Sequence, residues 1–452
     1  MANLFDDDDD DDRPGGPQPV DHRKVATRAG LIVPDARGIT SSHPVEMRKA
    51  EFEGLAAAIG LDIAFSEIVK LREVKPATFI GGGRLGEIKT QVKEQGVEVL
   101  LVDTALSPVQ QRNLETETET KVLDRTGLIL EIFGERAATR EGVLQVELAH
   151  LNYQRSRLVR SWTHLERQRG GFGFLGGPGE TQIESDRRLI EERIKLLEDR
   201  LDRVKRSRGQ QRGNREALQL PVVALVGYTN AGKSSLFNRL TGAGVFAENL
   251  LFATLDTTVR KLELPHGREV MLSDTVGFVS DLPTTLVAAF RATLEEVTNA
   301  DLILHVRDVA NPDSAPQAAD VLKVLGELDV SPETTPIIEV WNKVDLLPDG
   351  REALQTLAPA GVVVGSVPVS AQTGEGIDRL LATIEATLAK KSRTYRVWVP
   401  HVNGADVGWL YGHAEIIGKN EPDEEGQTYE VRVDPHHKAV FMQRFAGRID
   451  AL

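Results

Sequence analysis

The sequence predicts a multidomain α/β protein. Its 452 residues are too many for one ordinary hydrophobic core and indicate about three folded domains. Two long stretches alternate short apolar runs with helical patterns, as parallel α/β domains do, and a heptad pattern separates them. We therefore expect, in chain order, a disordered acidic tail over residues 1–22, an N-terminal parallel α/β domain over 23–138, an antiparallel helical hairpin with a glycine-rich tip over 139–217, a second α/β domain over 218–392 and a small α+β domain over 393–452.

The composition excludes several kinds of site. The chain has no cysteine, so disulfides and thiolate metal sites are excluded. The net charge is −14, and the seven consecutive aspartates Asp6–Asp12 account for half of it, so the remaining chain is much less acidic than the whole. The sequence shows no signal peptide and no apolar stretch of about 20 residues. We expect a cytoplasmic protein with at most peripheral membrane association, and a monomer that does not bind DNA.

The N-terminal domain is predicted from alternating patterns. The apolar runs Leu31–Val33, Ile63–Val69 and Val97–Val102 indicate strands, and the stretches Val45–Ala58 and Leu85–Glu94 between them indicate helices. Strands separated by helices favour a parallel sheet.

A glycine cluster, F79-I-G-G-G-R-L-G86, lies inside this domain. No Lys-Ser pair follows it, so we interpret it as a glycine-rich entry into a helix. The alternative is contact with an RNA or nucleotide phosphate, in which Arg84 would take part.

The hairpin is predicted from two apolar stripes. One stripe recurs every seven residues, and its members are Ile183, Ile190, Leu197 and Val204, with Ile194 and Leu201 between them. The partner stripe consists of Val143, Val146, Leu151, Leu158 and Trp162. The tip, R167-Q-R-G-G-F-G-F-L-G-G-P-G-E180, is basic, aromatic and too rich in glycine to be helical. We predict that it contacts RNA through Arg167, Arg169, Phe172 and Phe174. In the alternative, both phenylalanines pack back onto the protein.

A phosphate loop, G227-Y-T-N-A-G-K-S234, follows the apolar run Val222–Val226 and precedes a helical pattern. Glycines at a strand-to-helix turn allow backbone amides to surround an anion at the helix N-terminus. Lys233 is expected to contact the β- and γ-phosphates, and the Ser234 hydroxyl to bind Mg²⁺.

Three further strings complete a guanine-nucleotide site. In D274-T-V-G277, Asp274 would hold Mg²⁺ through a water molecule and the Gly277 amide would contact the γ-phosphate. In N342-K-V-D345, the Asp345 carboxylate would accept both N–H groups on the guanine edge, and Asn342 would bond to its acceptor side. The Lys343 stem would cover one face of the base and Ser370–Gln372 would close the other side. The chain order of these strings predicts a Ras-like P-loop GTPase domain that binds GTP and GDP.

The segment F252-A-T-L-D256 is the predicted first switch, because Thr254 can supply a second hydroxyl ligand for Mg²⁺. Thr257 and Thr258 compete for this role, and an exposed loop threonine is the alternative. Residues 245–260 and 277–290 are the expected moving parts, since a loop held by the γ-phosphate is released on hydrolysis.

The candidate residues fall into three groups. The catalytic candidates are Lys233, Asp274 and Gly277, and the metal ligands are Ser234 and Thr254. The nucleotide contacts are Gly227, Tyr228, Thr229, Asn230, Ala231, Gly232, Lys233, Ser234, Phe252, Ala253, Thr254, Leu255, Asp256, Asp274, Thr275, Val276, Gly277, Asn342, Lys343, Val344, Asp345, Ser370, Ala371 and Gln372.

Phe278 follows Gly277, where many GTPases have a glutamine that orients the attacking water. An apolar ring cannot do this, so we expect slow intrinsic hydrolysis that a partner, a monovalent cation or a rearranged switch completes. Asn230 suggests the cation, because related GTPases with asparagine here bind K⁺. The alternative is that Asn230 only stabilises the turn.

Five strings resemble the HflX family of ribosome-associated GTPases over about residues 25–390. They are L106-S-P-V-Q-Q-R-N-L114, D124-R-T-G-L-I-L-E-I-F133, Q145-V-E-L-A-H-L151, G176-G-P-G-E-T-Q182 and D274-T-V-G-F278. The resemblance implies binding to the large (50S) ribosomal subunit and its RNA, stimulation of GTP hydrolysis by that subunit, and splitting or rescue of stalled ribosomes under stress. It also implies that the glycine-rich tip approaches ribosomal RNA. The alternative function is a GTP-regulated RNA- or protein-binding module, such as a subunit assembly factor, in which hydrolysis only resets the binding state.

Overall fold

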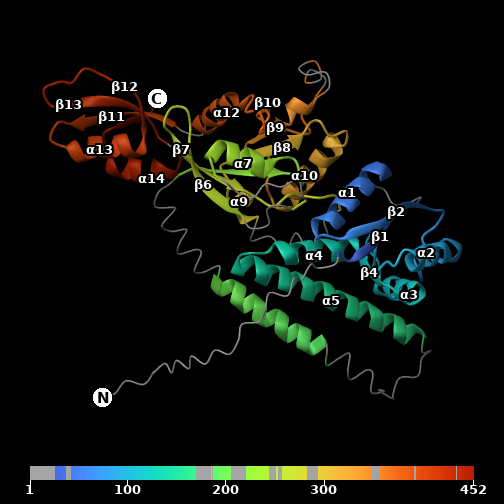
Figure 1. Cartoon of the computed structure of the whole chain (residues 1–452). Coiled ribbons are helices and arrows are strands. Elements are labelled where there is room, and N and C mark those ends of the chain that lie inside the picture. Colours follow the sequence, from blue (N-terminus) through green and yellow to red (C-terminus); the bar gives the residue numbers. More distant parts are fainter. Residues whose placement is uncertain are drawn as a thin grey trace, which may run out of the picture.

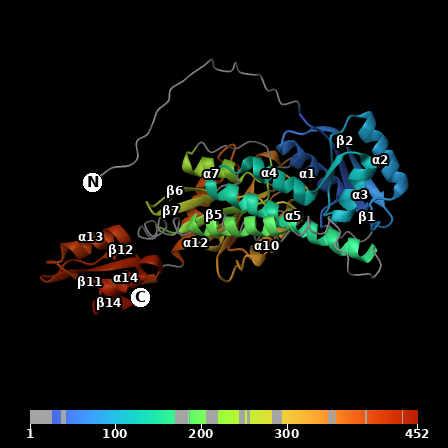
Figure 2. The same ribbon diagram turned by 90° about the horizontal axis from the view of Figure 1, so that it is seen from below.

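The computed structural model shows a central domain, hereafter the G domain, with the N-terminal and C-terminal domains on opposite sides of it (Figures 1 and 2). No described helix is both long and apolar enough to cross a membrane. The structure describes residues 26–36, 42–168, 185, 187–204, 220–243, 251–252, 257–281, 294–347, 352, 354, 357–390, 393–433 and 435–451, and the predicted tail over 1–22 lies outside them.

The N-terminal domain, hereafter the N-domain, is a parallel four-stranded sheet in the order β2-β1-β3-β4. Helices α1 and α4 pack on one face of the sheet, and α2 and α3 pack on the other. Gly81 is the N-cap residue of α2, so the glycine cluster forms the entry into a helix, while Arg84 pairs with Glu67 and Glu87. The elements are β1 (Arg28–Ala36), α1 (Val45–Ala58), β2 (Asp62–Leu71), α2 (Gly82–Glu94), β3 (Val99–Val102), α3 (Pro108–Thr118), β4 (Lys121–Asp124) and α4 (Arg125–Arg136).

The hairpin consists of α5 (Arg140–Gln168) and an antiparallel helix over 187–204 (Figure 2). Leu144 packs against Leu197 and Leu201. The predicted partner stripe is wrong in part, because Val143 is 48% exposed and Val146 packs into the N-domain core instead. Helix α5 has two apolar faces, one toward α4 and one toward the second helix, and a single stripe does not separate them. The side chains of Leu158 and Trp162 lie outside the described residues, as does Ile183.

The G domain has a six-stranded sheet in the order β10-β9-β8-β5-β7-β6, in which only the edge strand β6 is antiparallel to its neighbour. The four parallel strands β5, β7, β8 and β9 are mostly buried, which explains their near-continuous apolar runs. The elements are β5 (Val222–Gly227), α7 (Lys233–Thr241), β6 (Thr258–Glu263), β7 (Glu269–Asp274), α9 (Glu295–Thr298), β8 (Leu302–Asp308), α10 (Ser314–Glu327), β9 (Ile337–Asn342), η1 (Val344–Leu346), β10 (Gly365–Pro368) and α12 (Ile377–Ala389).

The C-terminal domain is an antiparallel sheet in the order β12-β13-β11-β14 with two helices on one face. The expected α+β class is confirmed. Glycines at 404, 408 and 412 obscure the helical pattern of α13, whose Leu410 is fully buried. The elements are β11 (Arg393–Pro400), α13 (Gly404–His413), β12 (Glu415–Lys419), β13 (Gly426–Val433), α14 (Pro435–Arg444) and β14 (Ile449–Ala451).

His43 joins the N-domain to the G domain. Its Nδ1 lies 2.5 Å from Asp313 Oδ2 and its Nε2 lies 2.7 Å from Asp320 Oδ2, and the ring is only 4% exposed. Burial alone would lower the pKa of His43, but hydrogen bonds and charge interactions with both carboxylates raise it to about 9.

We predict that the contribution of His43 to stability depends on pH. Because the pKa in the folded chain lies above the usual 6.5, the stabilisation is complete below pH 6.5 and is lost as the pH rises through 9. It amounts to about 3 kcal/mol at most. Thermal unfolding of the wild type and His43→Gln between about pH 6 and 10, a range that includes both pKa values, measures it. The difference between the two midpoints should shrink as the pH rises, and a constant difference would contradict the prediction.

Candidate nucleotide site

The phosphate loop connects the end of β5 to the start of α7, and two of its glycines are sterically required. A Cβ atom at Gly227 would lie 2.3 Å from the Val306 carbonyl oxygen. Gly232 has φ +91°, and a Cβ there would lie 2.2 Å from Asn342 Nδ2. Real Cβ atoms do not approach so closely, so only glycine lets the loop pass β8 and meet the Asn342 side chain.

Lys233 lies inside the loop. Its Nζ donates to the carbonyl oxygens of Gly227 at 3.1 Å and Tyr228 at 2.9 Å. Burial lowers the pKa of Lys233 to about 8, and the nearby Asp274 carboxylate only partly opposes this. A bound phosphate would add negative charge beside the amine and favour its protonated form.

The oxygen groups beside Lys233 suit Mg²⁺. The Ser234 hydroxyl donates to Asp274 Oδ2 at 2.7 Å, which brings one predicted metal ligand beside the carboxylate predicted to hold Mg²⁺ through water. Mg²⁺ prefers oxygen ligands and takes few of them from protein when phosphates and water supply the rest. Thr229 adds a buried hydroxyl that has no hydrogen-bond partner in the described part of the chain, so a ligand here would satisfy a polar group. The residues present therefore fit a magnesium-bound nucleotide.

The base-recognition loops are held against the phosphate loop. Asn342 Nδ2 donates to the Ala231 carbonyl oxygen at 2.9 Å, and its Oδ1 accepts from the Ala371 amide at 3.0 Å. Arg239 of α7 donates to the Ala371 carbonyl oxygen at 3.0 Å and also to that of Gln372. Lys343 pairs with Asp308 at 2.8 Å, while Asp345 is exposed.

The backbone after Asp274 pairs with the phosphate loop. The Thr229 amide donates to the Phe278 carbonyl oxygen at 2.7 Å, and the Phe278 amide donates to the Gly227 carbonyl oxygen at 3.2 Å. A Cβ at Gly277 would lie 2.8 Å from Thr229 Cγ2 and 3.0 Å from Lys233 Nζ. Phe278 itself is 2% exposed and belongs to the hydrophobic core, so no water-orienting group stands at its position.

The structure brings many of the predicted nucleotide contacts together around the phosphate loop, but three side chains point elsewhere. The Phe252 ring packs edge-to-face on Phe133 of α4, with centroids 4.7 Å apart, and the Tyr228 hydroxyl donates to Glu51 of α1. The Thr275 hydroxyl donates to the Leu225 carbonyl oxygen within the core. The segment Ala253–Asp256, which includes Thr254, lies outside the described residues, as do Arg169, Phe172, Phe174 and the side chain of Arg167.

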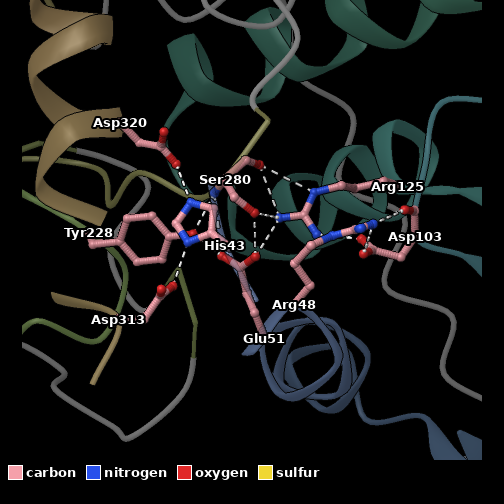
Figure 3. Close-up of polar contacts among 9 residues, drawn as sticks. All are labelled: His43, Arg48, Glu51, Asp103, Arg125, Tyr228, Ser280, Asp313 and Asp320. Carbon is pink, nitrogen blue, oxygen red and sulfur yellow. Dashed lines mark hydrogen bonds and ion pairs between the residues drawn. The ribbon is translucent and has the colours of Figure 1, made fainter. Parts of the chain in front are cut away.

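Sequence reasoning missed the residues that connect this site to the N-domain. Glu51 accepts from Tyr228 of the phosphate loop and from Ser280, and Arg125 donates to Ser280 (Figure 3). A signal was present in the string D124-R-T-G, because Arg125 stands directly before a fully apolar helix face, where a buried charge needs a partner.

The six-stranded sheet, its phosphate loop and the Asn342 loop that reaches it define a P-loop GTPase. Four family models match the chain: the N-terminal region of GTP-binding GTPases over residues 46–134, their middle region over 136–215, a 50S ribosome-binding GTPase over 222–343 and the HflX C-terminal domain over 359–450.

Curated relatives agree with these models. GTPase HflX of Magnetococcus marinus is 49% identical over 83% of this chain and 85% of the relative, and GTPase HflX of Escherichia coli is 45% identical over 84% and 87%. The chain therefore belongs to the HflX family of GTPases, which confirms the predicted family and enzyme class. A GTP-binding protein from Sulfolobus solfataricus, solved with GDP, is 24% identical over 80% of this chain and 98% of that chain, with a TM-score of 0.42.

We predict that Asp345→Asn changes the base preference of the site from guanine to xanthine. An asparagine offers one donor and one acceptor, which suit the carbonyl and N–H of xanthine but not the two N–H donors of guanine. GDP affinity should fall by about 10²-fold or more and XDP affinity should rise. Calorimetric titration of both nucleotides measures this. If the variant keeps wild-type GDP affinity, Asp345 does not bind the base.

Proposed function

We propose that this GTPase binds the large ribosomal subunit and its RNA, and that it couples GTP binding and hydrolysis to the splitting or rescue of ribosomes under stress. The proposal rests on one observation above the others, which is the match of residues 222–343 to a model described as a 50S ribosome-binding GTPase.

The roles of the site residues belong to this proposal. Lys233 and the Gly277 amide would bind the phosphates, Ser234 and Thr254 would hold Mg²⁺ directly, and Asp274 would hold it through water. The ion would neutralise charge that develops on the phosphates during hydrolysis. The hydrogen bond between Ser234 and Asp274 and the cradle of glycine backbone around Lys233 support these roles.

The hairpin is the proposed RNA-contacting element. Helix α5 and the helix over 187–204 pack through Leu144, Leu197 and Leu201, and this rigid pair carries the segment that contains Arg169, Phe172 and Phe174. Aromatic rings that stack on bases and arginines that neutralise phosphate suit single-stranded or looped RNA. The RNA contacts of these three residues and of Arg167 remain part of the proposal.

We predict that purified large ribosomal subunits raise the rate of GTP hydrolysis by about 10-fold or more, because Phe278 leaves the isolated site without a group that orients water. Phosphate release with and without subunits measures this. Lys233→Ala is the control and should abolish turnover in both cases. A rate that subunits leave unchanged would remove the main support for the ribosomal assignment.

The same preparation separates hydrolysis-driven action from simple binding. If 70S particles dissociate with a non-hydrolysable GTP analogue, the binding energy of the GTP-bound state does the work, and the chain acts as a GTP-regulated binding module. If dissociation requires GTP, hydrolysis itself is coupled to splitting.

We also propose that K⁺ assists hydrolysis through Asn230. This residue has φ +59° in the phosphate loop and an exposed side chain, so its amide oxygen is accessible to an ion. We predict faster turnover in K⁺ than in Na⁺ at equal ionic strength, and loss of this difference in Asn230→Ala. Equal rates in both salts would leave Asn230 with a role in the turn only.

A further inference from the structure

The region of the N-domain beyond the carboxyl ends of β1 and β3, hereafter the crevice, is where sheets of this topology usually bind ligands. In a parallel sheet ordered β2-β1-β3-β4, the chain leaves β1 toward β2 on one side and leaves β3 toward β4 on the other. Open α/β sheets bind their ligands at such a switch point, beyond the carboxyl ends of the strands. Arg48 lies there, since it donates to the Pro34 carbonyl oxygen of β1 at 3.2 Å and to the Asp103 carbonyl oxygen beyond β3 at 2.9 Å.

Ser280 of the G domain occupies this crevice (Figure 3). Its carbonyl oxygen accepts from Arg125 at 3.0 Å, and its hydroxyl accepts from Arg125 at 2.7 Å and donates to Glu51 at 2.6 Å. Its amide donates to the Tyr228 hydroxyl at 2.6 Å, which in turn donates to Glu51. All polar groups of Ser280 are therefore engaged, as in a bound ligand.

Four buried charges balance in this cluster. Asp103 accepts from Arg48 at 2.7 Å and from Arg125 at 2.6 Å, and Arg125 also donates to Glu51 at 2.7 Å. Burial alone would raise the pKa of Glu51, but Arg125 and the hydroxyl donors lower it, so the carboxylate is ionised. Two arginines and two carboxylates leave no net charge, and the removal of one member would leave its partner uncompensated.

The start of the predicted first switch and the residue before it also contact the N-domain. Phe252 packs on Phe133, and a Cβ at Gly54 of α1 would lie 3.1 Å from Leu251 Cδ1. Between these contacts and the phosphate loop is a cavity of about 270 Å³, lined by residues that include Met47, Thr229, Asn230 and Gln317. Polar clusters around a cavity are more typical of an interface that opens than of a permanent core.

We infer that the N-domain crevice is a receptor for Ser280 and that GTP binding opposes this docking. Ser280 is three residues beyond Gly277, whose amide is the proposed γ-phosphate contact. In the docked arrangement, Gly277 lies against Thr229 and Lys233, and the Thr229 amide is used by the Phe278 carbonyl oxygen. A γ-phosphate that draws Gly277 into contact must compete with these bonds and pull on Ser280. By linkage, docking must weaken GTP binding as much as GTP weakens docking. The inference rests on the proposed nucleotide site but not on the ribosome.

Hydrogen exchange of the full chain tests the first half of this linkage. Amides of α1 (Val45–Ala58) should exchange faster with a non-hydrolysable GTP analogue than with GDP, while α13 of the C-terminal domain, which lies away from the crevice, should not change (Figure 1). Equal exchange of α1 in the two states would overturn the inference.

Nucleotide affinities of two mild variants test the second half. Ser280→Ala and Tyr228→Phe each remove a hydroxyl from Glu51, and each should raise the affinity for the GTP analogue relative to GDP by about 10-fold. The matched control is Tyr153→Phe. This variant removes a hydroxyl of α5 that donates to Asp124 of the N-domain at 2.6 Å, and it should leave the ratio of the two nucleotide affinities unchanged.

In the double variant Tyr228→Phe with Ser280→Ala, the change in the free energy that separates GTP-analogue binding from GDP binding should be smaller than the sum of the two single changes, because both hydroxyls bind Glu51. Thermal unfolding verifies that each variant is folded. Equal changes in both affinities would make the cluster merely structural and overturn the inference. If the wild type binds neither nucleotide, the proposed nucleotide site itself is wrong. If all variants bind nucleotide but the ratio of GTP-analogue to GDP affinity stays constant, only the inference about docking is wrong.

Discussion

The contact between the N-domain and the G domain depends on a buried group of four charges, formed by Arg48, Glu51, Asp103 and Arg125. Such a group is stable only when every member is paired, because an isolated buried charge loses its hydration without compensation. All four members belong to the N-domain and pair there, so the G domain docks onto a charge network that is already balanced. Tyr228 and Ser280 complete the hydrogen bonds of Glu51, which connects the phosphate loop and the chain beyond Gly277 to this network.

Apolar packing extends this connection. One hydrophobic core runs from the N-terminal sheet through Phe52 and Phe133 to Phe252 and Phe278 of the G domain. Residues that sequence motifs assign to the nucleotide site thus also belong to the core between the two domains. Phe278 shows that packing and catalysis compete at one position, because an apolar side chain buried in the core cannot also orient water. The slow chemistry expected of the isolated enzyme and the cohesion of its two domains have the same structural origin.

The sequence predicts the nucleotide site better than the domain interface, for a physical reason. A phosphate loop is a local structure, in which a strand, glycines and a helix N-terminus lie within about a dozen residues. The interface joins residues that are 155 and 177 positions apart, namely Arg125 with Ser280 and Glu51 with Tyr228. Periodicity shows that a face is buried but not what covers it. The misassigned stripe on α5 has the same cause, since Val146 and Leu144 are both apolar and pack against different elements.

The hydrogen bonds of Asn342 have a consequence for how long a nucleotide stays bound. They join the base loop directly to the phosphate loop through Ala231 and to the closing loop through Ala371. The two halves of the site are thus preorganised at a fixed spacing. When one end of a bound nucleotide detaches, the end that is still bound would keep the free end at a high effective concentration. Reattachment would then be faster than complete dissociation. Fast exchange would then require an external factor that separates the two loops, rather than one that weakens either set of contacts alone.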